Sequence, residues 1–288
     1  MRTLTSSLIL VACLLAGAFR PAPVFAAAPT VDSVRFAVAQ NGANVSPITL
    51  AANAMKIYYI NGDVSDTDGF ADISDVDADF YRSSISGAGD CSADQNNCYH
   101  QTTCTLSSGS GNTVSYSCRI DLAYFADYTD ADTYASDTWK IRVSVTDSNT
   151  TITDTTYSNE LTSLAAIDVP GSLNYGTLSL GATSSTTGMT VKNAGNHLVD
   201  AQVWSTTGMT CTSGTIPLSN QHWDKVSVAY GSLQFTLSTT PTRSTINLSI
   251  QSDDATAVTG DLFFAIQLPA NGIGGTCTGT LNITAYAF

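Results

Sequence analysis

The sequence predicts an all-β protein made of two tandem antiparallel β-sandwiches. Of its 24 acidic residues only Glu160 is a glutamate, and lysine and arginine together number 11 in 288 residues, so the charged residues that favour helices are scarce. Short apolar or alternating segments are separated by stretches rich in Ser, Thr, Asp and Gly, a pattern typical of strands joined by turns. The hydrophobic share of 43% is enough for a buried core, whereas the net charge of −13 excludes the basic face that nucleic acid requires.

The first 26 residues have the features of a secretory signal peptide. Arg2 precedes an apolar run, Leu8–Phe19, and small residues end at Ala26, after which we expect cleavage. Twelve apolar residues are too few to cross a bilayer of about 30 Å as a helix. A bacterial lipoprotein signal ending at Cys13 is the alternative, since Leu10-Val11-Ala12-Cys13 resembles a lipobox. Both interpretations predict a secreted or cell-surface protein without a transmembrane segment in the mature chain.

The remaining cysteines are even in number, which predicts disulfides in an exported chain. They are Cys91, Cys98, Cys104, Cys118, Cys211 and Cys277. We expect the two distant ones, Cys211 and Cys277, to form one bridge. Three pairings are open to the other four, and Cys91–Cys98 with Cys104–Cys118 is favoured because both close short loops. No C-x2-C pair is present, so a zinc site is not expected.

Residues 27–165 are predicted to form the first sandwich, with a cysteine-rich insertion at residues 90–119. Its clearest strand, 138–145, has apolar residues at every second position from Trp139 to Val145, so Trp139 is expected in the core. Asp75, Asp77 and Asp79 also alternate with apolar residues, and we interpret them as a plain exposed face.

Residues 166–288 are predicted to form the second sandwich, beginning near the turn at Pro170-Gly171. This half carries six acidic and three basic residues, against 18 and six in residues 27–165. Seven segments have strand character, and these are 172–180, 189–192, 198–204, 232–237, 245–250, 262–268 and 280–288.

Both halves resemble Ig-like domains of prokaryotic cell-surface proteins. In the first half the resemblance, to PKD and cadherin-like domains, is carried by residues 61–73 (NGDVSDTDGFADI) and by 139–147 (WKIRVSVTD). In the second half it is carried by 174–181 (NYGTLSLG), 189–196 (MTVKNAGN) and 275–284 (GTCTGTLNIT). The resemblance implies tandem Ig-like β-sandwiches and a role at the cell surface.

An acidic loop is the one pattern that predicts chemistry. Asp63, Asp66, Asp68 and Asp72 lie within ten residues, and crowded carboxylates of this kind suit Ca²⁺, which takes six to eight oxygens. The EF-hand spacing is not met, because its first position is Val64. In the surface domains that the chain resembles, such a loop meets the end of a later strand, which implies Asp147 as a further ligand. An ordinary solvated turn is the alternative.

A second acidic stretch is a further candidate for a metal site. It contains Asp127, Asp130, Asp132 and Asp137.

No catalytic motif is found in the sequence. His100, His197 and His222 lie outside the G-x-S-x-G and H-E-x-x-H contexts, and we expect surface histidines and no enzyme.

We therefore expect a structural or adhesive surface protein whose partners are other surface proteins, itself or surface glycans. One alternative is a filament or matrix subunit, in which the start of the mature chain or residues 280–288 add a strand to a neighbour. Another is carbohydrate binding through Trp204, Trp223 and Tyr230.

Overall fold

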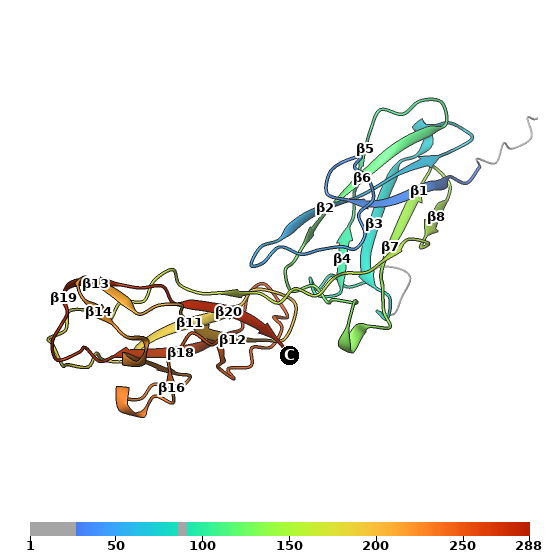
Figure 1. The fold of residues 1–288 in the computed structure, drawn as a ribbon. Coiled ribbons are helices and arrows are strands. Elements are labelled where there is room, and N and C mark those ends of the chain that lie inside the picture. The colour runs from blue at the N-terminus through green and yellow to red at the C-terminus, as the bar shows by residue number, and fades with distance from the viewer. Residues whose placement is uncertain (1–26, 86–90) are drawn as a thin grey trace, which may run out of the picture.

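The structure is a computed structural model that describes residues 27–85 and 91–288. The predicted signal peptide and Cys13 lie outside the described residues. All ladders between the named strands are antiparallel, and Figure 1 shows them gathered in two bodies. The predicted fold class, all-β with two tandem antiparallel sandwiches, is confirmed, while the Ig-like character stays a resemblance.

The first sandwich is built from two facing sheets, with strand orders β1-β2-β6-β5 and β4-β3-β7-β8. β9 also pairs with β7. The strands are β1 (Thr30–Ala37), β2 (Lys56–Ser65), β3 (Asp75–Arg82), β4 (Cys98–Gln101), β5 (Thr105–Leu106), β6 (Thr113–Leu122), β7 (Trp139–Thr146), β8 (Thr151–Asp154) and β9 (Ser158–Asn159). Two 3-10 turns, η1 (Phe70–Asp72) and η2 (Asp132–Tyr134), lie between them.

Stacked aromatic rings form the centre of this sandwich. Phe80 of β3 stacks on Phe36 of β1 and on Trp139 of β7, with ring centroids 4.5 Å apart in both pairs. Trp139 is fully buried, as the alternation in its strand predicts, and its indole Nε1 donates a 2.8 Å hydrogen bond to the Asp127 carbonyl. The core therefore joins both sheets through large side chains whose one polar atom is satisfied.

The cysteine-rich segment is not an insertion, which corrects the sequence prediction. It supplies β4, β5 and most of β6, and β6 pairs with β2 along ten residues. Disulfides join Cys91 to Cys98 and Cys104 to Cys118, the pairing that short loops favour. Its polar composition hides the alternation of β6, whose residues on one face are buried and on the other are partly exposed.

The second sandwich has a five-stranded sheet, β10-β11-β18-β15-β16, which faces a three-stranded sheet, β17-β12-β20. A smaller sheet, β14-β13-β19, extends one end. The strands are β10 (Ile167–Asp168), β11 (Thr187–Asn193), β12 (Val199–Trp204), β13 (Met209–Ser213), β14 (Thr215–Ile216), β15 (Gln221–Asp224), β16 (Phe235–Thr236), β17 (Thr242–Arg243), β18 (Thr259–Ile266), β19 (Gly274–Thr278) and β20 (Asn282–Ala287). Cys211 of β13 is bonded to Cys277 of β19, and η3 (Leu218–Asn220) and η4 (Tyr230–Ser232) are 3-10 turns.

Two strands predicted in the second half are irregular segments. Thr245 and Asn247 have φ values of 57° and 51°, which a ladder does not allow. The backbone amide of Ile246 donates to the buried Asp200 carboxylate, 2.7 Å away, and the segment wraps around it. Residues 172–180 are interrupted at Gly176, where φ is 78° and the amide donates to the Asn174 side chain. Local polar bonds thus replace a continuous ladder at both places, although Leu248 keeps one antiparallel bridge to Val199.

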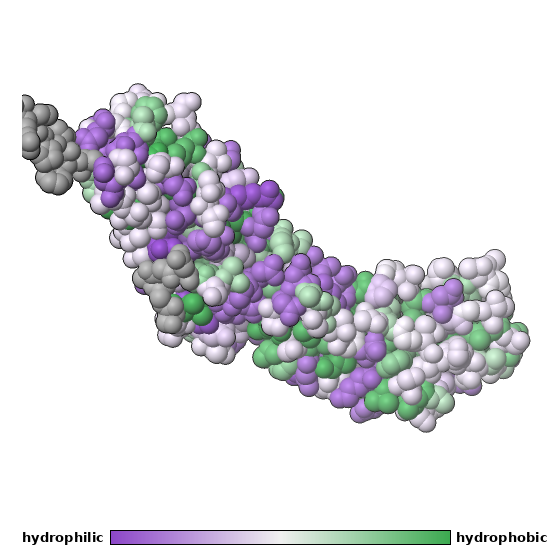
Figure 2. All heavy atoms as spheres, turned by 180° about the vertical axis from the view of Figure 1, so that it is seen from behind, coloured by the Kyte–Doolittle hydropathy of each residue, from purple (hydrophilic) through white to green (hydrophobic). Residues whose placement is uncertain are grey.

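Polar contacts join the two sandwiches. Asn196 is fully buried, donates to the Ala126 carbonyl at 2.8 Å and accepts the Leu164 amide at 2.6 Å. The Tyr124 hydroxyl bonds the Gln251 side chain at 2.6 Å. Figure 2 shows frequent hydrophilic residues over the first sandwich and the junction, and a paler surface over much of the second. No helix in residues 27–85 and 91–288 has the length and apolar character needed to cross a membrane.

Replacing Trp139 by alanine is expected to lower the free energy of unfolding by about 3–5 kcal/mol, because it leaves a cavity between the sheets. Urea denaturation of the mature chain measures the change. Lys140→Ala, at the next position on the outer face of β7, is the matched control and is expected to change stability by less than about 0.5 kcal/mol. Equal effects of the two substitutions would contradict this description of the core.

Candidate metal site

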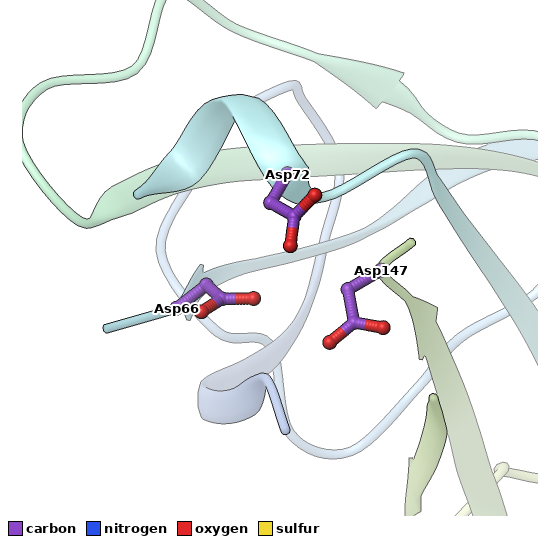
Figure 3. A group of neighbouring side chains, drawn as sticks. All are labelled: Asp66, Asp72 and Asp147. Atoms are coloured by element: carbon purple, nitrogen blue, oxygen red, sulfur yellow. The ribbon is translucent and has the colours of Figure 1, made fainter. Parts of the chain in front are cut away.

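Three aspartates from distant parts of the chain meet at one end of the first sandwich (Figure 3). Asp66 follows the last residue of β2, Asp72 ends η1, and Asp147 follows the last residue of β7. One carboxylate oxygen from each lies within 4.8 Å of the other two. We call these three residues the Asp cluster.

Asp66 is the most constrained member of the Asp cluster. It is 1% exposed, and its Oδ1 accepts the Asp68 backbone amide at 2.9 Å. Its Oδ2 is buried and has no hydrogen-bond partner. In Figure 3 the carboxylate of Asp66 points toward Asp72 and Asp147. An ionised oxygen in this position is costly unless a cation compensates it.

The loop that follows β7 fixes the carboxylate of Asp147. The backbone amides of Thr150 and Asn149 donate to its Oδ1, and these bonds lower the pKa of Asp147. Asp72 accepts the hydroxyl of Ser148 at 3.1 Å. None of the three carboxylates is ion-paired with a lysine, arginine or histidine of the described chain. The Asp cluster therefore concentrates negative charge without a protein counter-charge.

The donor set of the Asp cluster fits a hard cation. It contains carboxylate oxygens alone, with no histidine nitrogen or cysteine sulfur, which favours Ca²⁺ or Mg²⁺ over zinc or copper. Ca²⁺ accepts irregular geometry and mixed carboxylate, carbonyl and water ligands, whereas Mg²⁺ demands a near-octahedral arrangement. The orphan oxygen of Asp66 is the feature that a bound cation would satisfy.

Two of the five predicted ligands lie outside the Asp cluster. Asp63 is inside β2, where it accepts hydroxyl hydrogen bonds from Ser115 and Ser33 and lies 3.8 Å from the Arg35 guanidinium. The pKa of Asp63 is lowered, and the hydrogen bond from Ser115 makes the largest contribution to this shift. Asp68 accepts the Ala27 amide at 2.6 Å. The structure therefore does not bring Asp63 and Asp68 into the Asp cluster, because strand geometry and a local bond direct their carboxylates to other partners.

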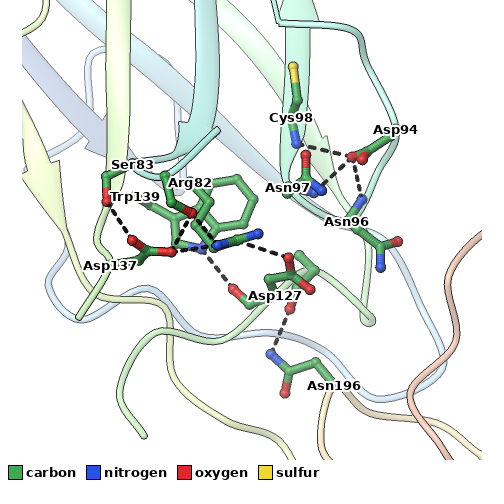
Figure 4. A network of polar contacts seen from close by, with 12 residues as sticks. Arg82, Ser83, Asp94, Asn96, Asn97, Cys98, Asp127, Asp137, Trp139 and Asn196 are labelled. Carbon is green, nitrogen blue, oxygen red and sulfur yellow. Dashed lines mark hydrogen bonds and ion pairs between the residues drawn. The ribbon is translucent and has the colours of Figure 1, made fainter. Parts of the chain in front are cut away.

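The second acidic stretch has structural roles (Figure 4). Asp127 and Asp137 both bind the buried guanidinium of Arg82. Burial raises the pKa of Asp127, although Arg82 opposes that shift. Asp130 accepts the Ser163 amide and Asp132 lies 3.2 Å from His197 Nε2. Asp127 and Asp137 share Arg82, while Asp130 and Asp132 bond other residues, and this distribution argues against a metal site here.

The predicted exposed face of β3 is partly covered, which corrects the sequence prediction. Asp79 is 1% exposed and binds Arg142 at 2.6 Å and His100 on its other side. The opposed positions of β4, β3 and β7 create this row. Burial raises the pKa of the neighbouring Asp77. His100 is thus a strand residue paired with a carboxylate and not a residue of a surface loop.

Trp223 does not belong to the sugar-stacking platform that the sequence offers as an alternative. This residue is fully buried in the second core and stacks on Phe235 at 4.5 Å. His222, which precedes it in β15, stacks on Tyr230 at 4.5 Å.

The sequence analysis also missed Asp200 as a key residue of the second sandwich. It is fully buried and accepts hydrogen bonds from Arg243, Ser244 and Ile246. Its partners follow more than 40 residues later, so no local motif reveals the contact. Burial opposes ionisation of Asp200, but the bonds from Arg243 and Ser244 outweigh it and lower the pKa.

No protein-family model matches the chain, and no curated protein matches it. The PKD and cadherin-like resemblance therefore stays a prediction. Among solved structures, the chain is similar to the chaperone–tip adhesion subunit pre-assembly complex CsuC–CsuE, from archaic chaperone-usher Csu pili of Acinetobacter baumannii. The identity is 13%, the coverage is 91% of this chain and 100% of that chain, and the TM-score is 0.38.

A second structure, named BspA_C_mut, is 12% identical, with coverage of 92% and 99% and a TM-score of 0.25. Similarity this low carries no functional argument, which must come from the residues themselves.

Replacing Asp200 by asparagine is expected to lower the free energy of unfolding by about 3 kcal/mol at pH 7, because it breaks a buried ion pair. The folded-state pKa of Asp200 is below its unfolded value of about 3.9. Its contribution is thus present above pH 4 and is lost as the pH falls through the folded-state pKa. Urea denaturation between pH 7 and pH 3 should show the gap between wild type and variant narrowing below pH 4.

Asp254→Asn is the matched control for this experiment, since Asp254 is exposed and forms no ion pair in the described chain. We expect it to follow the wild-type curve. A gap for Asp200→Asn that stays constant down to pH 3 would contradict the assigned charge state.

Proposed function

We propose that the protein is an exported structural or adhesive component of the cell surface, and that Ca²⁺ bound at the Asp cluster stiffens its first sandwich. Residues 27–165 and 166–288 would act as two tandem modules. Function on this proposal depends on a rigid scaffold and its surfaces, and no catalytic centre is required.

Three disulfides support an extracellular location. Each sandwich has at least one bridge, and such bonds persist in oxidising compartments. The bridge from Cys211 to Cys277 spans 66 residues and contributes about 4 kcal/mol in the chain-entropy model. The signal-peptide pattern that ends at Ala26 supports export independently.

The buried, unpartnered Oδ2 of Asp66 is the observation that carries the calcium proposal. Elsewhere in the described chain, the buried carboxylates of Asp79, Asp127 and Asp200 each have an arginine partner. The three carboxylates of the Asp cluster carry up to three negative charges. One divalent cation would neutralise two of them and would thereby relieve most of the repulsion among the carboxylates. Ca²⁺ would thereby tie the ends of β2, η1 and β7 together.

In the filament alternative, the first or the last strand of the chain adds to a neighbouring subunit, but both strands are already paired within this chain. Thr30–Ala37 is β1 and pairs with β2, while Asn282–Ala287 is β20 and pairs with β12 in the same chain. A segment already hydrogen-bonded in its own sheet would have to leave it before adding to a neighbour's. We therefore favour a protein that works as a single copy.

Calcium is expected to raise the melting temperature of the mature chain, residues 27–288, relative to the same protein in excess EGTA. Binding to the folded state alone stabilises by about 2.7 kcal/mol when free calcium is 100 times Kd. Differential scanning calorimetry measures the shift. Asp66→Asn is expected to abolish the calcium response and to melt above wild type in EGTA, since it removes an uncompensated buried charge.

Asp63→Asn is the matched control, because Asp63 lies three residues earlier and outside the Asp cluster. It should keep the full calcium response. Identical melting of the wild type in calcium and in EGTA would overturn the calcium site, while leaving the surface role to be judged separately.

The mature protein is expected to be a monodisperse monomer at high concentration, because both candidate donor strands are paired internally. Light scattering after size-exclusion chromatography and negative-stain electron microscopy test this expectation. Regular filaments or a concentration-dependent increase in mass would contradict it and would restore the matrix-subunit alternative.

A further inference from the structure

The second sandwich contains a cavity that none of the roles above uses. Its volume is about 530 Å³, within the range of small-molecule sites. It lies between residues 169–175, which form no ladder, and residues 279–284, which lead into β20. Ser172, Thr280 and Thr284 at its rim are exposed, so the cavity opens to solvent.

A buried glutamine lines this cavity without a hydrogen-bond partner for its side chain. Gln221 is 8% exposed, and its amide group forms no hydrogen bond within the described chain. Because side chains alternate along a strand, Gln221 shares the inward face of β15 with the buried Trp223. Its backbone is fixed by pairing with Ile266 and by the Leu237 amide. The backbone of Gln221 is thus fixed by the sheet, and its side-chain amide is left without a partner among the described residues at the cavity wall.

The rest of the lining combines uncharged polar groups with apolar surface. Tyr175 supplies an aromatic ring, and its hydroxyl also lacks a partner among the described residues. Burial raises the pKa of Tyr175, so the hydroxyl stays neutral. Apolar contacts come from Leu173, Met189, Met209, Leu281 and Ile283, and further amide and hydroxyl groups from Asn282, Thr207 and Thr284. Among the residues that the structure describes, no acidic, basic or histidine side chain lines the cavity.

We propose that this cavity binds a neutral mono- or disaccharide, with the Gln221 amide and the Tyr175 hydroxyl bonding its polar groups. A sugar ring offers hydroxyl groups at its edge and an apolar C–H face, which matches amide and hydroxyl donors set among methionine, leucine and aromatic side chains. The absence of charged lining residues selects against acidic sugars, whose carboxylate would lose hydration without a compensating cation.

Sugar binding at this cavity would give the proposed surface protein a ligand. The proposal depends on the proposed function only in placing the protein at the cell surface. The residues differ from the predicted platform of Trp204, Trp223 and Tyr230, none of which lines the cavity. Sugar binding and calcium binding are measured separately, so either can fail alone.

Isothermal titration and saturation-transfer NMR on residues 27–288 test the proposal with glucose, galactose, N-acetylglucosamine and lactose. At least one of these sugars is expected to bind saturably. Gln221→Leu, which keeps the volume and removes the amide, should weaken that binding about tenfold. Its melting temperature should not fall, because the variant loses a buried group without a partner.

Gln234→Leu is the matched control, since Gln234 is exposed and lies outside the cavity. It should bind with wild-type affinity. Failure of all four sugars to bind saturably would overturn the proposal, as would equal affinities of wild type and Gln221→Leu. Glucuronic acid should bind more weakly than glucose, and equal binding would contradict the neutral class.

Discussion

A carboxylate buried in a β-sandwich needs a positive partner or hydrogen-bond donors for both of its oxygens, and this constraint organises much of the molecule. Asp79 has Arg142, Asp127 has Arg82 and Asp200 has Arg243. Each pair joins strands or loops far apart in sequence, because opposed strand positions bring the charges together. Removing either member leaves an uncompensated charge in a region of low dielectric constant. Asp224 is buried without an arginine, but backbone amides bond both of its oxygens. The Asp cluster has neither form of compensation for the buried Oδ2 of Asp66.

Basic residues are scarce, so only a few of the carboxylates can have an arginine or lysine partner. Residues 27–165 contain six lysines and arginines for 18 acidic residues, so most carboxylates must remain hydrated or bind hydroxyl and amide donors. Asp63 does so through two serines, and Asp147 through the loop that follows it. Asp66 is buried too deeply for hydration and has one amide donor for two oxygens. A cation is the remaining way to compensate it.

The sequence predicts what depends on local periodicity and composition, and fails where distant residues meet. Alternation from Trp139 to Val145 identifies a core strand, and cysteine spacing favours the observed pairing. The sequence places Asp66, Asp72 and Asp147 in one candidate ligand set, and the structure brings these three together. Spacing alone does not reveal that the side chains of Asp63 and Asp68 lie elsewhere. Residues 245–250 have strand composition, yet hydrogen bonds to Asp200 hold them outside the ladders. Such contacts form only once the sheets have assembled.

Asp66 and Gln221 are two forms of the same physical anomaly. Both are at least nine-tenths buried, and neither Asp66 Oδ2 nor the Gln221 amide has a hydrogen-bond partner among the described residues. The Asp66 oxygen is closed off from solvent, whereas Gln221 lines the open cavity. Their surroundings differ, and the difference determines the ligand. Asp66 faces two other carboxylates, so a cation would satisfy it, whereas Gln221 faces an uncharged cavity with apolar and hydroxyl groups. Because folding alone does not reward an unsatisfied buried group, the calcium and sugar proposed above would each supply the partner that the described residues do not.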